Sequence, residues 1–359
     1  MTTIDLGLPS IGGLDGVPTT DDKQSAKDYK SDQEVRWCPG CGDYAVLAAV
    51  QSFMPTLGLK RENIVFVSGI GCSSRFPYYM DTYGVHSIHG RAPAFATGLA
   101  VSRPDLSVWV VTGDGDALSI GGNHLMHTLR RNVNLKILLF NNRIYGLTKG
   151  QYSPTSETGK ITKSTPMGSL DNPFNPVSLA LGAEATFVAR AIDSDRKQLT
   201  EVLGAAAAHR GTALVEIYQN CPIFNDGAFD VLKEPGERDR RIIPLRHGQP
   251  IRFGGGDDGG EYGVARDPNT GSLQVRKVTE VGEDALVVHD ASLADPSYAF
   301  ALSRLTDTSL AHTVTGVFRS VDRQTYDDAA RAQVQQAKDS KPADLQALIT
   351  GKDTWTIAG

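Results

Sequence analysis

The sequence is poor in three things, and each shortage excludes a class of protein. Only four of the 359 residues are cysteine, too few for a fold stapled by disulfides. No apolar run reaches the roughly 18 residues of a membrane helix, so we expect no membrane attachment. Lys and Arg number 36 against 41 Asp and Glu, and the resulting net charge of −5 argues against nucleic-acid binding. A basic-then-apolar signal pattern is also missing from the N-terminus, which predicts a cytoplasmic location.

Short apolar stretches alternate with helical patterns between residues 43 and 220. We predict strands at Asn63–Ser68, Ser107–Thr112, Leu135–Phe140, Phe187–Ala191 and Ala213–Tyr218. We predict helices at Asp43–Leu57, Arg91–Ser102, Ala117–Arg131, Pro176–Leu181 and Arg196–His209. Nearly continuous apolar strands separated by helices are typical of a parallel sheet covered on both faces. The fold class is therefore a doubly wound α/β domain, which binds ligands beyond the carboxyl ends of its strands.

The chain divides into three predicted parts. Residues 1–35 are rich in Gly, Pro, Thr and Asp, and we expect a flexible or extended N-terminal arm. Residues 36–225 form the α/β domain, and residues 226–359 form a C-terminal extension. In the extension we expect a loop at Gly254–Gly260 with hairpins beside it, and helices at Tyr298–Arg304 and Tyr326–Lys338.

Two polar motifs follow predicted strands. Gly113-Asp114-Gly115-Asp116 comes after SVWVVT, and Asn141-Asn142 comes after LKILLF. One helix and one strand fit between them in a right-handed crossover, so both loops should meet at one sheet edge. Glycines let the backbone approach a phosphate, and the next helix offers it free N–H groups. Oxygens of Asp114, of Asn142 and of the Ile144 carbonyl suit Mg²⁺ or Ca²⁺, whereas a lone GDG would be an ordinary turn.

The four cysteines also flank predicted strands. Cys38 and Cys41 form a CxxC before the first helix, Cys72 follows NIVFVS, and Cys221 follows ALVEIY. Four thiolates can hold a [4Fe–4S] cluster, with glycine-rich flanks leaving backbone N–H groups free to bond the sulfurs. The same ligands suit tetrahedral zinc, and buried thiols without any metal are a third possibility. Spacing alone leaves all three open.

Other polar side chains near these motifs have two interpretations each. Arg75, Arg143 and Lys149 surround them and could bind a substrate carboxylate or coenzyme A phosphates, or could lie on solvated surface. His124 and His127 have a metal-chelating i, i+3 spacing, but we expect ordinary packing because no acidic partner is evident.

Taken together, the motifs WCPGCG, GIGCSSR, HGR and GDGD followed by NNRIYGLTKGQ have a specific order along residues 36–225. In this the chain resembles the β subunits of 2-oxoacid:ferredoxin oxidoreductases, which have the thiamine-diphosphate-binding fold. The resemblance implies a [4Fe–4S] cluster on Cys38, Cys41, Cys72 and Cys221, and Mg²⁺ on Asp114, Asn142 and Ile144. It also implies that thiamine diphosphate is lined by Ile70, Gly71, Cys72, Ser73, His89, Gly115, Asp116, Gly146 and Leu147.

The same resemblance implies an activity and a set of partners. The family decarboxylates a 2-oxoacid oxidatively, passes the acyl group to coenzyme A and passes electrons through the cluster to ferredoxin. The stretch GLTKGQYSPTSETG is most similar to members that use 2-oxoglutarate, and pyruvate or a broad range of 2-oxoacids is the alternative substrate. In the family an α subunit supplies the glutamate that activates thiamine, so we expect a heterodimer or heterotetramer and an inactive isolated chain.

Two other functions fit parts of the pattern. One is a non-oxidative thiamine-diphosphate decarboxylase or carboligase with a structural zinc at the cysteines. The other is an electron carrier that holds a cluster without thiamine, against which the intact pair of Asp114 and Asn142 speaks.

Overall fold

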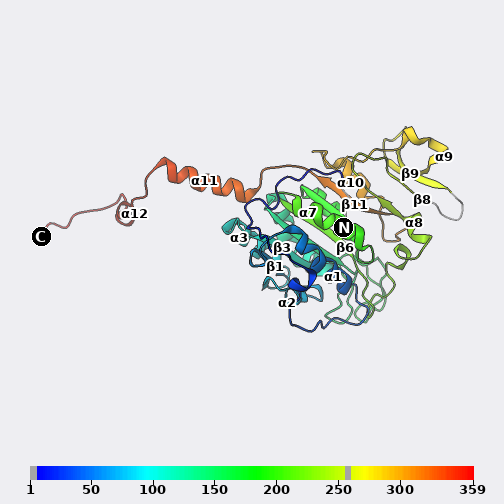
Figure 1. Ribbon diagram of the computed structural model, residues 1–359, viewed down its shortest axis with the longest axis horizontal. Helices are drawn as coiled ribbons and strands as arrows, with labels where there is room; N and C mark the ends of the chain where they lie inside the picture. Colours follow the sequence, from blue (N-terminus) through cyan, green and yellow to red (C-terminus); the bar gives the residue numbers. More distant parts are fainter. Residues whose placement is uncertain (1–5, 255–259) are drawn as a thin grey trace.

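An eight-stranded sheet forms the centre of the computed structural model, which describes residues 6–254 and 260–359 (Figure 1). Its strands lie in the order β2-β1-β3-β4-β6-β5-β11-β7. Their bounds are β1 Ile64–Ser68, β2 Tyr83–His86, β3 Ser107–Gly113, β4 Leu135–Asn141, β5 Phe187–Ile192, β6 Thr212–Tyr218, β7 Ile242–Pro244 and β11 Thr313–Ser320. The first six strands in this order, β2, β1, β3, β4, β6 and β5, are parallel, while β11 runs antiparallel to β5 and parallel to β7. The predicted doubly wound sheet is confirmed.

Alternate residues of the central strands enter two separate hydrophobic cores. Leu138 and Phe140 of β4 lie in one core, whereas Ile137 and Leu139 of the same strand lie in the other. Side chains point to opposite faces along a strand, so a strand that is apolar at every position needs cover on both sides. This is why the sequence shows continuous rather than alternating apolar runs here.

Helices supply that cover. On one face α1 packs beside α7, and on the other α3, α5, α6 and α10 pack over the sheet. The α-helices are α1 Asp43–Phe53, α2 Phe76–Tyr79, α3 Ala92–Ser102, α4 Asp114–Leu118, α5 Gly122–Arg131, α6 Pro176–Gly182, α7 Arg196–Ala208, α8 Glu237–Arg241, α9 Val278–Val281, α10 Ser297–Ser303, α11 Tyr326–Ser340 and α12 Leu345–Thr350. The 3₁₀ turns are η1 Ala26–Tyr29, η2 Met54–Leu57, η3 Arg61–Asn63, η4 Ser73–Arg75, η5 Asp230–Leu232 and η6 Glu283–Ala285.

The structure departs from the predicted elements after β3. We expected one helix at Ala117–Arg131, but α4 ends at Leu118 and α5 begins at Gly122. Between them the Cα of Gly121 lies against the backbone of Asp116, where an added Cβ would stand 2.4 Å from the Asp116 carbonyl oxygen. Glycine permits this close approach, which turns the chain away from the helix axis.

The C-terminal part contributes to the main sheet as well as forming its own. The strands β7 and β11 extend the central sheet, although we expected only loops, hairpins and helices after residue 225. A second sheet pairs β8 Arg252–Gly254 with β9 Glu261–Arg266, and β9 with β10 Leu273–Lys277, all antiparallel. Most of the loop that we predicted at Gly254–Gly260 lies outside the described residues.

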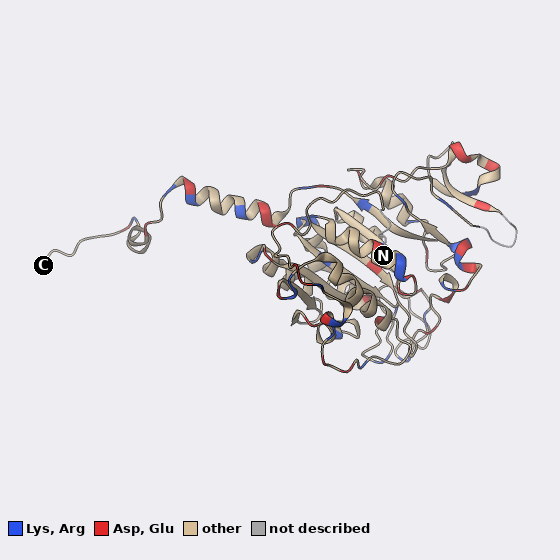
Figure 2. Cartoon of the chain, in the orientation of Figure 1, with Lys and Arg blue, Asp and Glu red and all other residues tan. Residues whose placement is uncertain are grey.

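The two ends of the chain behave differently. The described part of the arm runs mainly extended over the α1 and α7 side, and Val17 and Tyr29 are buried there. In Figure 1, α11 and α12 instead project away from the body, and every residue after Arg331 is exposed. Charged residues lie mainly on peripheral elements such as α8, α9 and α11, whereas the central strands are mostly uncharged (Figure 2). None of the described helices has the length and apolarity to cross a bilayer.

Candidate functional site

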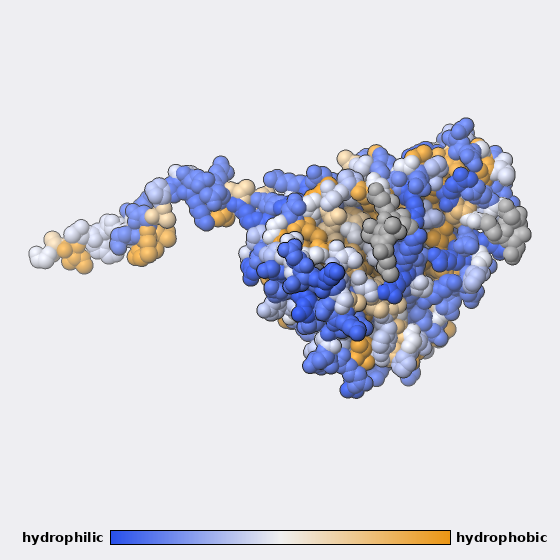
Figure 3. All heavy atoms as spheres, in the orientation of Figure 1, coloured by the Kyte–Doolittle hydropathy of each residue, from blue (hydrophilic) through white to orange (hydrophobic). Residues whose placement is uncertain are grey.

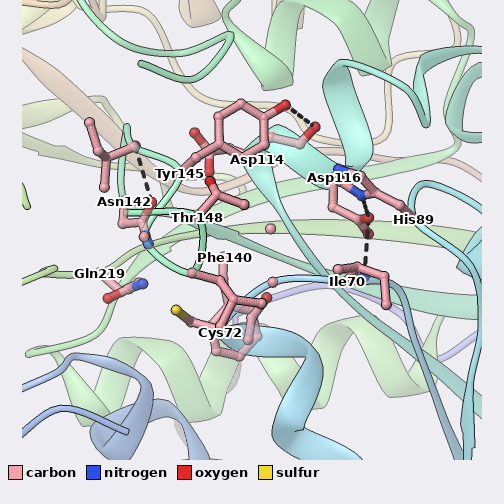
Figure 4. A pocket seen from close by; sticks show the side chains of 17 residues that line it. Ile70, Cys72, His89, Asp114, Asp116, Phe140, Asn142, Tyr145, Thr148 and Gln219 are labelled. Atoms are coloured by element: carbon pink, nitrogen blue, oxygen red, sulfur yellow. Dashed lines mark hydrogen bonds and ion pairs between the residues drawn. The ribbon is translucent and has the colours of Figure 1, made fainter. Parts of the chain in front are cut away.

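One cavity lies beyond the carboxyl ends of β1, β3, β4 and β6. All twelve residues that we predicted for cofactor and Mg²⁺ line it. They are Ile70, Gly71, Cys72, Ser73, His89, Asp114, Gly115, Asp116, Asn142, Ile144, Gly146 and Leu147. Figure 4 shows His89, Asp116 and Ile70 together at one end, with Asn142, Gln219 and Cys72 towards the other. The parallel sheet thus brings together five segments that are far apart in the sequence, and the His89 loop after β2 is one of them.

The GDGD segment forms the floor of this cavity. Gly113 ends β3 and is the N-cap of α4, and Asp114 is the first residue of that short helix. The ring of Tyr145 lies so close to Gly115 that an added Cβ would stand 2.2 Å from its Cε1 atom. The Tyr145 hydroxyl donates to the Gly115 carbonyl over 2.9 Å. Glycine at 115 is therefore required by the packing of the two loops.

A buried carboxylate and an amide lie where we predicted a cation. Asp114 is 2% exposed, and burial raises its pKa to about 6 even though hydroxyl donors oppose that shift. Such a group keeps its negative charge more readily when a cation is bound. The Asn142 side-chain oxygen accepts from the Ile144 backbone N–H over 3.1 Å, which holds the two residues in one turn. Hard oxygens of this kind fit Mg²⁺.

Asp116 joins three loops rather than standing free in the cavity. Its Oδ1 accepts from the His89 ring, from Gly90 N over 2.7 Å and from Ile70 N over 3.2 Å. Its Oδ2 accepts from the Thr112 hydroxyl over 2.6 Å. Because one carboxylate bonds to all of them, the Ile70 and His89 loops keep fixed positions beside GDGD.

The four cysteines share a neighbouring cavity of about 220 Å³. Cys38 is exposed, Cys221 is buried, and Cys41 and Cys72 are half-buried. A Cβ added at Gly146 would lie 3.4 Å from the Cys72 sulfur and 3.7 Å from the Cys221 sulfur, so glycine leaves space beside both. The loops around α1, β1 and β6 therefore bring all four predicted ligands to one place.

Burial and neighbouring acidic groups raise the pKa of two of these thiols. Burial, Asp43 and the other thiols together raise the pKa of Cys72 to about 12. The pKa of Cys41 is raised still further by the same causes. Four ionised thiols would repel one another strongly in this cavity, and a positive metal centre relieves that repulsion. Asp43 itself is buried, and burial raises its pKa to about 7.

The spacing of the sulfurs bears on which metal fits. Over residues 6–254 and 260–359, no three His, Cys, Asp or Glu side chains are grouped closely enough to hold a single ion. Zinc needs sulfurs about 2.3 Å from one point, whereas a cluster of four irons spreads its thiolates apart. Four cysteines around one cavity are the ligand set of either metal centre.

One functional candidate escaped the sequence-based prediction. Gln219 is 1% exposed, lines the first cavity, and its side-chain oxygen lacks a partner among the described residues. It directly follows β6, so the strand-end rule that found Asn142 could have found it. Trp37 is buried against Tyr44 and Tyr79, and its ring N–H donates to the Cys72 carbonyl over 2.7 Å. That contact anchors the Cys72 loop.

The remaining basic and histidine candidates separate clearly. Arg143 is 7% exposed, donates to the Thr308 carbonyl and lies over the rings of Tyr218 and Phe229, so it does not face a ligand. Arg75 and Lys149 are exposed and line the cysteine cavity. The pair on α5, His124 and His127, belongs to no metal-binding group among the residues that the structure describes.

Known proteins share this architecture and sequence. The family described as thiamine pyrophosphate enzyme, C-terminal TPP binding domain, matches residues 69–217. The 2-oxoglutarate oxidoreductase subunit KorB of Mycobacterium tuberculosis is 68% identical over 98% of this chain and 94% of its own. A 2-oxoglutarate synthase subunit KorB of Archaeoglobus fulgidus is 42% identical over 61% of this chain and 82% of its own.

A solved structure extends the likeness to three dimensions. It is the 2-oxoglutarate:ferredoxin oxidoreductase from Magnetococcus marinus with 2-oxoglutarate, coenzyme A and succinyl-CoA bound. The two chains superpose with a TM-score of 0.74 at 34% identity, over 94% of this chain and 99% of the other.

Proposed function

This chain belongs to the β subunits of the 2-oxoglutarate:ferredoxin oxidoreductases, and from that premise we propose that it holds thiamine diphosphate, Mg²⁺ and one [4Fe–4S] cluster in its two adjoining cavities. Its thiamine-pyrophosphate-binding domain and its place as one subunit of an oxidoreductase follow from the family. The metals and the individual ligands are the proposal. One observation carries it: twelve predicted cofactor residues and four cysteines line two cavities that share a wall.

The proposal gives the residues of the first cavity specific roles. Asp114, Asn142 and the Ile144 carbonyl would bind Mg²⁺, and the cation would bind the diphosphate. Thiamine diphosphate supplies the carbanion chemistry that releases CO₂ from a 2-oxoacid. Gly115 lines the same cavity and leaves room there for the Tyr145 ring.

The cysteines Cys38, Cys41, Cys72 and Cys221 would hold the cluster. Cys72 and Gly146 line both cavities, so electrons leaving the cofactor have a short path to the cluster. Cys38 is exposed, and this is the side from which ferredoxin would take them.

We infer that the substrate is 2-oxoglutarate and that coenzyme A accepts the succinyl group, as the Magnetococcus marinus complex contains all three molecules. Lys149 is exposed two residues after Leu147, which lines the cofactor cavity. An ammonium group there suits the distal carboxylate of this substrate. The thiamine-activating glutamate comes from an α subunit, so the active enzyme contains both chains.

Metal content and substrate turnover test the proposal. Anaerobically purified chain should be brown with four irons, and Cys41→Ser should lose most of that iron while the exposed control Ser102→Ala keeps it. Together with its α subunit the chain should reduce ferredoxin with 2-oxoglutarate and coenzyme A faster than with pyruvate. One zinc per chain, or decarboxylation without ferredoxin reduction, would instead favour the non-oxidative alternative.

A further inference from the structure

The turn Ser153–Ser156 is polar, yet it is buried. It belongs to the stretch GLTKGQYSPTSETG, follows the short bridge between Tyr145 and Gln151, and carries three hydroxyl side chains. Ser153, Thr155 and Ser156 are only 2%, 3% and 3% exposed. Burying hydroxyl groups is costly unless each finds a hydrogen-bond partner, so the partners indicate what the turn is for.

Two of these hydroxyls converge on one oxygen of the metal-site carboxylate. The Ser153 hydroxyl donates to Asp114 Oδ2 over 2.5 Å, and the Thr155 hydroxyl donates to the same atom over 2.6 Å. The Ser156 hydroxyl instead donates to the Arg143 carbonyl over 2.6 Å, which ties the turn to the Asn142 loop. Both loops that would bind the cation are therefore fastened to this turn.

We propose that Ser153 and Thr155 are positioning residues of the cation site, which hold the Asp114 carboxylate in the orientation that binds the metal. The inference rests on the proposed function, because it presumes that Asp114 binds the cation. Two donors on one oxygen fix the plane of the carboxylate, and ligands oriented in advance bind metal more tightly. Neither hydroxyl needs to touch the metal or the diphosphate.

The turn Ser153–Ser156 is itself anchored to the centre of the sheet. Ser156 bonds to the Arg143 carbonyl, and the Arg143 backbone N–H donates to Asn141 Oδ1 over 3.1 Å. Asn141 Nδ2 in turn donates to Glu216 Oε1 over 2.7 Å. Glu216 Oε2 accepts from Arg190 Nε over 2.7 Å, and both of these charged side chains are fully buried. The asparagine pair thus divides its work: Asn142 lines the cavity, and Asn141 connects the turn to the interior.

Matched variants of the full chain test the positioning role. Thr155→Val keeps the shape and removes the hydroxyl, Ser153→Ala does the same at its position, and Thr155→Ser restores a donor. Thr158→Val and Ser164→Ala are controls, since these exposed hydroxyls lie outside the site and bond to Asp171 O and to Thr162. The readouts are the Mg²⁺ and Mn²⁺ concentrations that half-saturate binding of thiamine diphosphate, followed by tryptophan fluorescence, together with the melting temperature.

We expect Thr155→Val and Ser153→Ala to raise the half-saturating metal concentration about 10-fold or more. Thr155→Ser and both controls should stay close to the wild-type value, and the melting temperatures should stay alike. Unchanged metal binding in both Thr155→Val and Ser153→Ala would overturn the inference. So would a weakening in Thr155→Val that Thr155→Ser does not rescue. If the wild-type chain itself bound no metal and thiamine diphosphate, the proposed function would fail instead.

Discussion

At the scale of single residues, the candidate site depends on a few acceptors that each serve several donors. Asp116 is the clearest example, since one carboxylate accepts from His89, Gly90, Ile70 and Thr112. Its neighbour Gly69 has no room for a side chain, because an added Cβ would stand 1.8 Å from Asp116 Oδ2. The two residues are matched to each other.

Replacing this acceptor should loosen the loops around the cofactor. Asp116→Asn keeps the size of the side chain but turns one acceptor into a donor that faces other donors. Unsatisfied buried groups cost about 1–3 kcal/mol, so we expect thiamine diphosphate to bind about 10-fold more weakly. Titration of the purified chain measures this, with the exposed Asp32→Asn as control. Equal affinity for thiamine diphosphate in Asp116→Asn and wild type would show that the hydrogen bonds of Asp116 do not support the site.

Some site residues could be predicted from the sequence and others could not. Asp114 and Asn142 directly follow strands that are mostly apolar, and Cys72 lies four residues after another such strand, so strand ends locate them without a structure. Ser153 and Thr155 lie 39 and 41 residues from Asp114 in a long irregular loop. No local pattern specifies that such a turn folds back under β3, because tertiary packing alone creates the contact.

At the scale of elements, an ion pair stands in the middle of the sheet. Arg190 on β5 and Glu216 on β6 pair over 2.7 Å, and Arg190 also donates to the Val314 carbonyl on β11 and to the Thr306 hydroxyl. The guanidinium therefore links three neighbouring strands, including one from the C-terminal part.

Breaking that pair should be far more costly than breaking one at the surface. Glu216→Gln leaves Arg190 charged and buried without its counter-ion, and such a change costs about 3–5 kcal/mol of unfolding free energy. Asp105→Asn, which breaks an exposed pair with Arg103, should cost less than about 1 kcal/mol. Denaturant unfolding followed by circular dichroism compares the two. Similar losses in both variants would contradict the role given to the buried pair.

The same elements show where sequence patterns are informative. The strands β1, β3, β4, β5 and β6 could be predicted because apolar residues dominate their sequences, as expected for strands covered on both faces. All four residues of the edge strand β2 are exposed, so it lacks that signature. The strand β11 also escaped the prediction, since its sequence TVTGVFRS mixes buried hydroxyls, a glycine and an arginine with apolar residues.

At the scale of the whole molecule, a dense body carries a projecting end. Figure 3 shows apolar groups along the projecting segment, and among its exposed side chains are Leu345, Leu348, Ile349, Trp355 and Ile357. An isolated helix as short as α12 is marginal in water. Because every residue after Arg331 is exposed, the projecting end adds little buried surface. The stability of the rest of the chain depends on its hydrophobic cores and on its buried polar groups.

One buried histidine should make that stability depend on pH. Burial lowers the pKa of His289 to about 4, well below the ordinary value of 6.5. Between these values the unfolded chain binds a proton that the folded chain does not, so its contribution to stability is lost as pH falls from about 6.5 towards 4. At pH 5 the loss is about 2 kcal/mol.

A variant isolates this contribution from other titrating groups. His289→Gln cannot take up the proton but can still donate to the Val317 carbonyl, which the ring contacts over 2.8 Å. The fall in unfolding free energy between pH 7 and pH 5 should be smaller in the variant by about 2 kcal/mol. Identical falls in both proteins would mean that His289 is protonated in the folded state.

Because the two cavities share lining residues, damage to the metal site should also disturb the cofactor site. Cys72, Asn142, Gly146 and Leu147 line both cavities, so the proposed cluster and the proposed thiamine site would adjoin each other directly. If oxygen removes iron from the cysteines, the segments of Cys72 and Gly146 lose that anchor. The same segments also line the coenzyme site. We expect enzyme damaged by oxygen to bind thiamine diphosphate more weakly as it loses the absorption of the cluster. Recovery should then require that the cluster and the bound coenzyme are both restored.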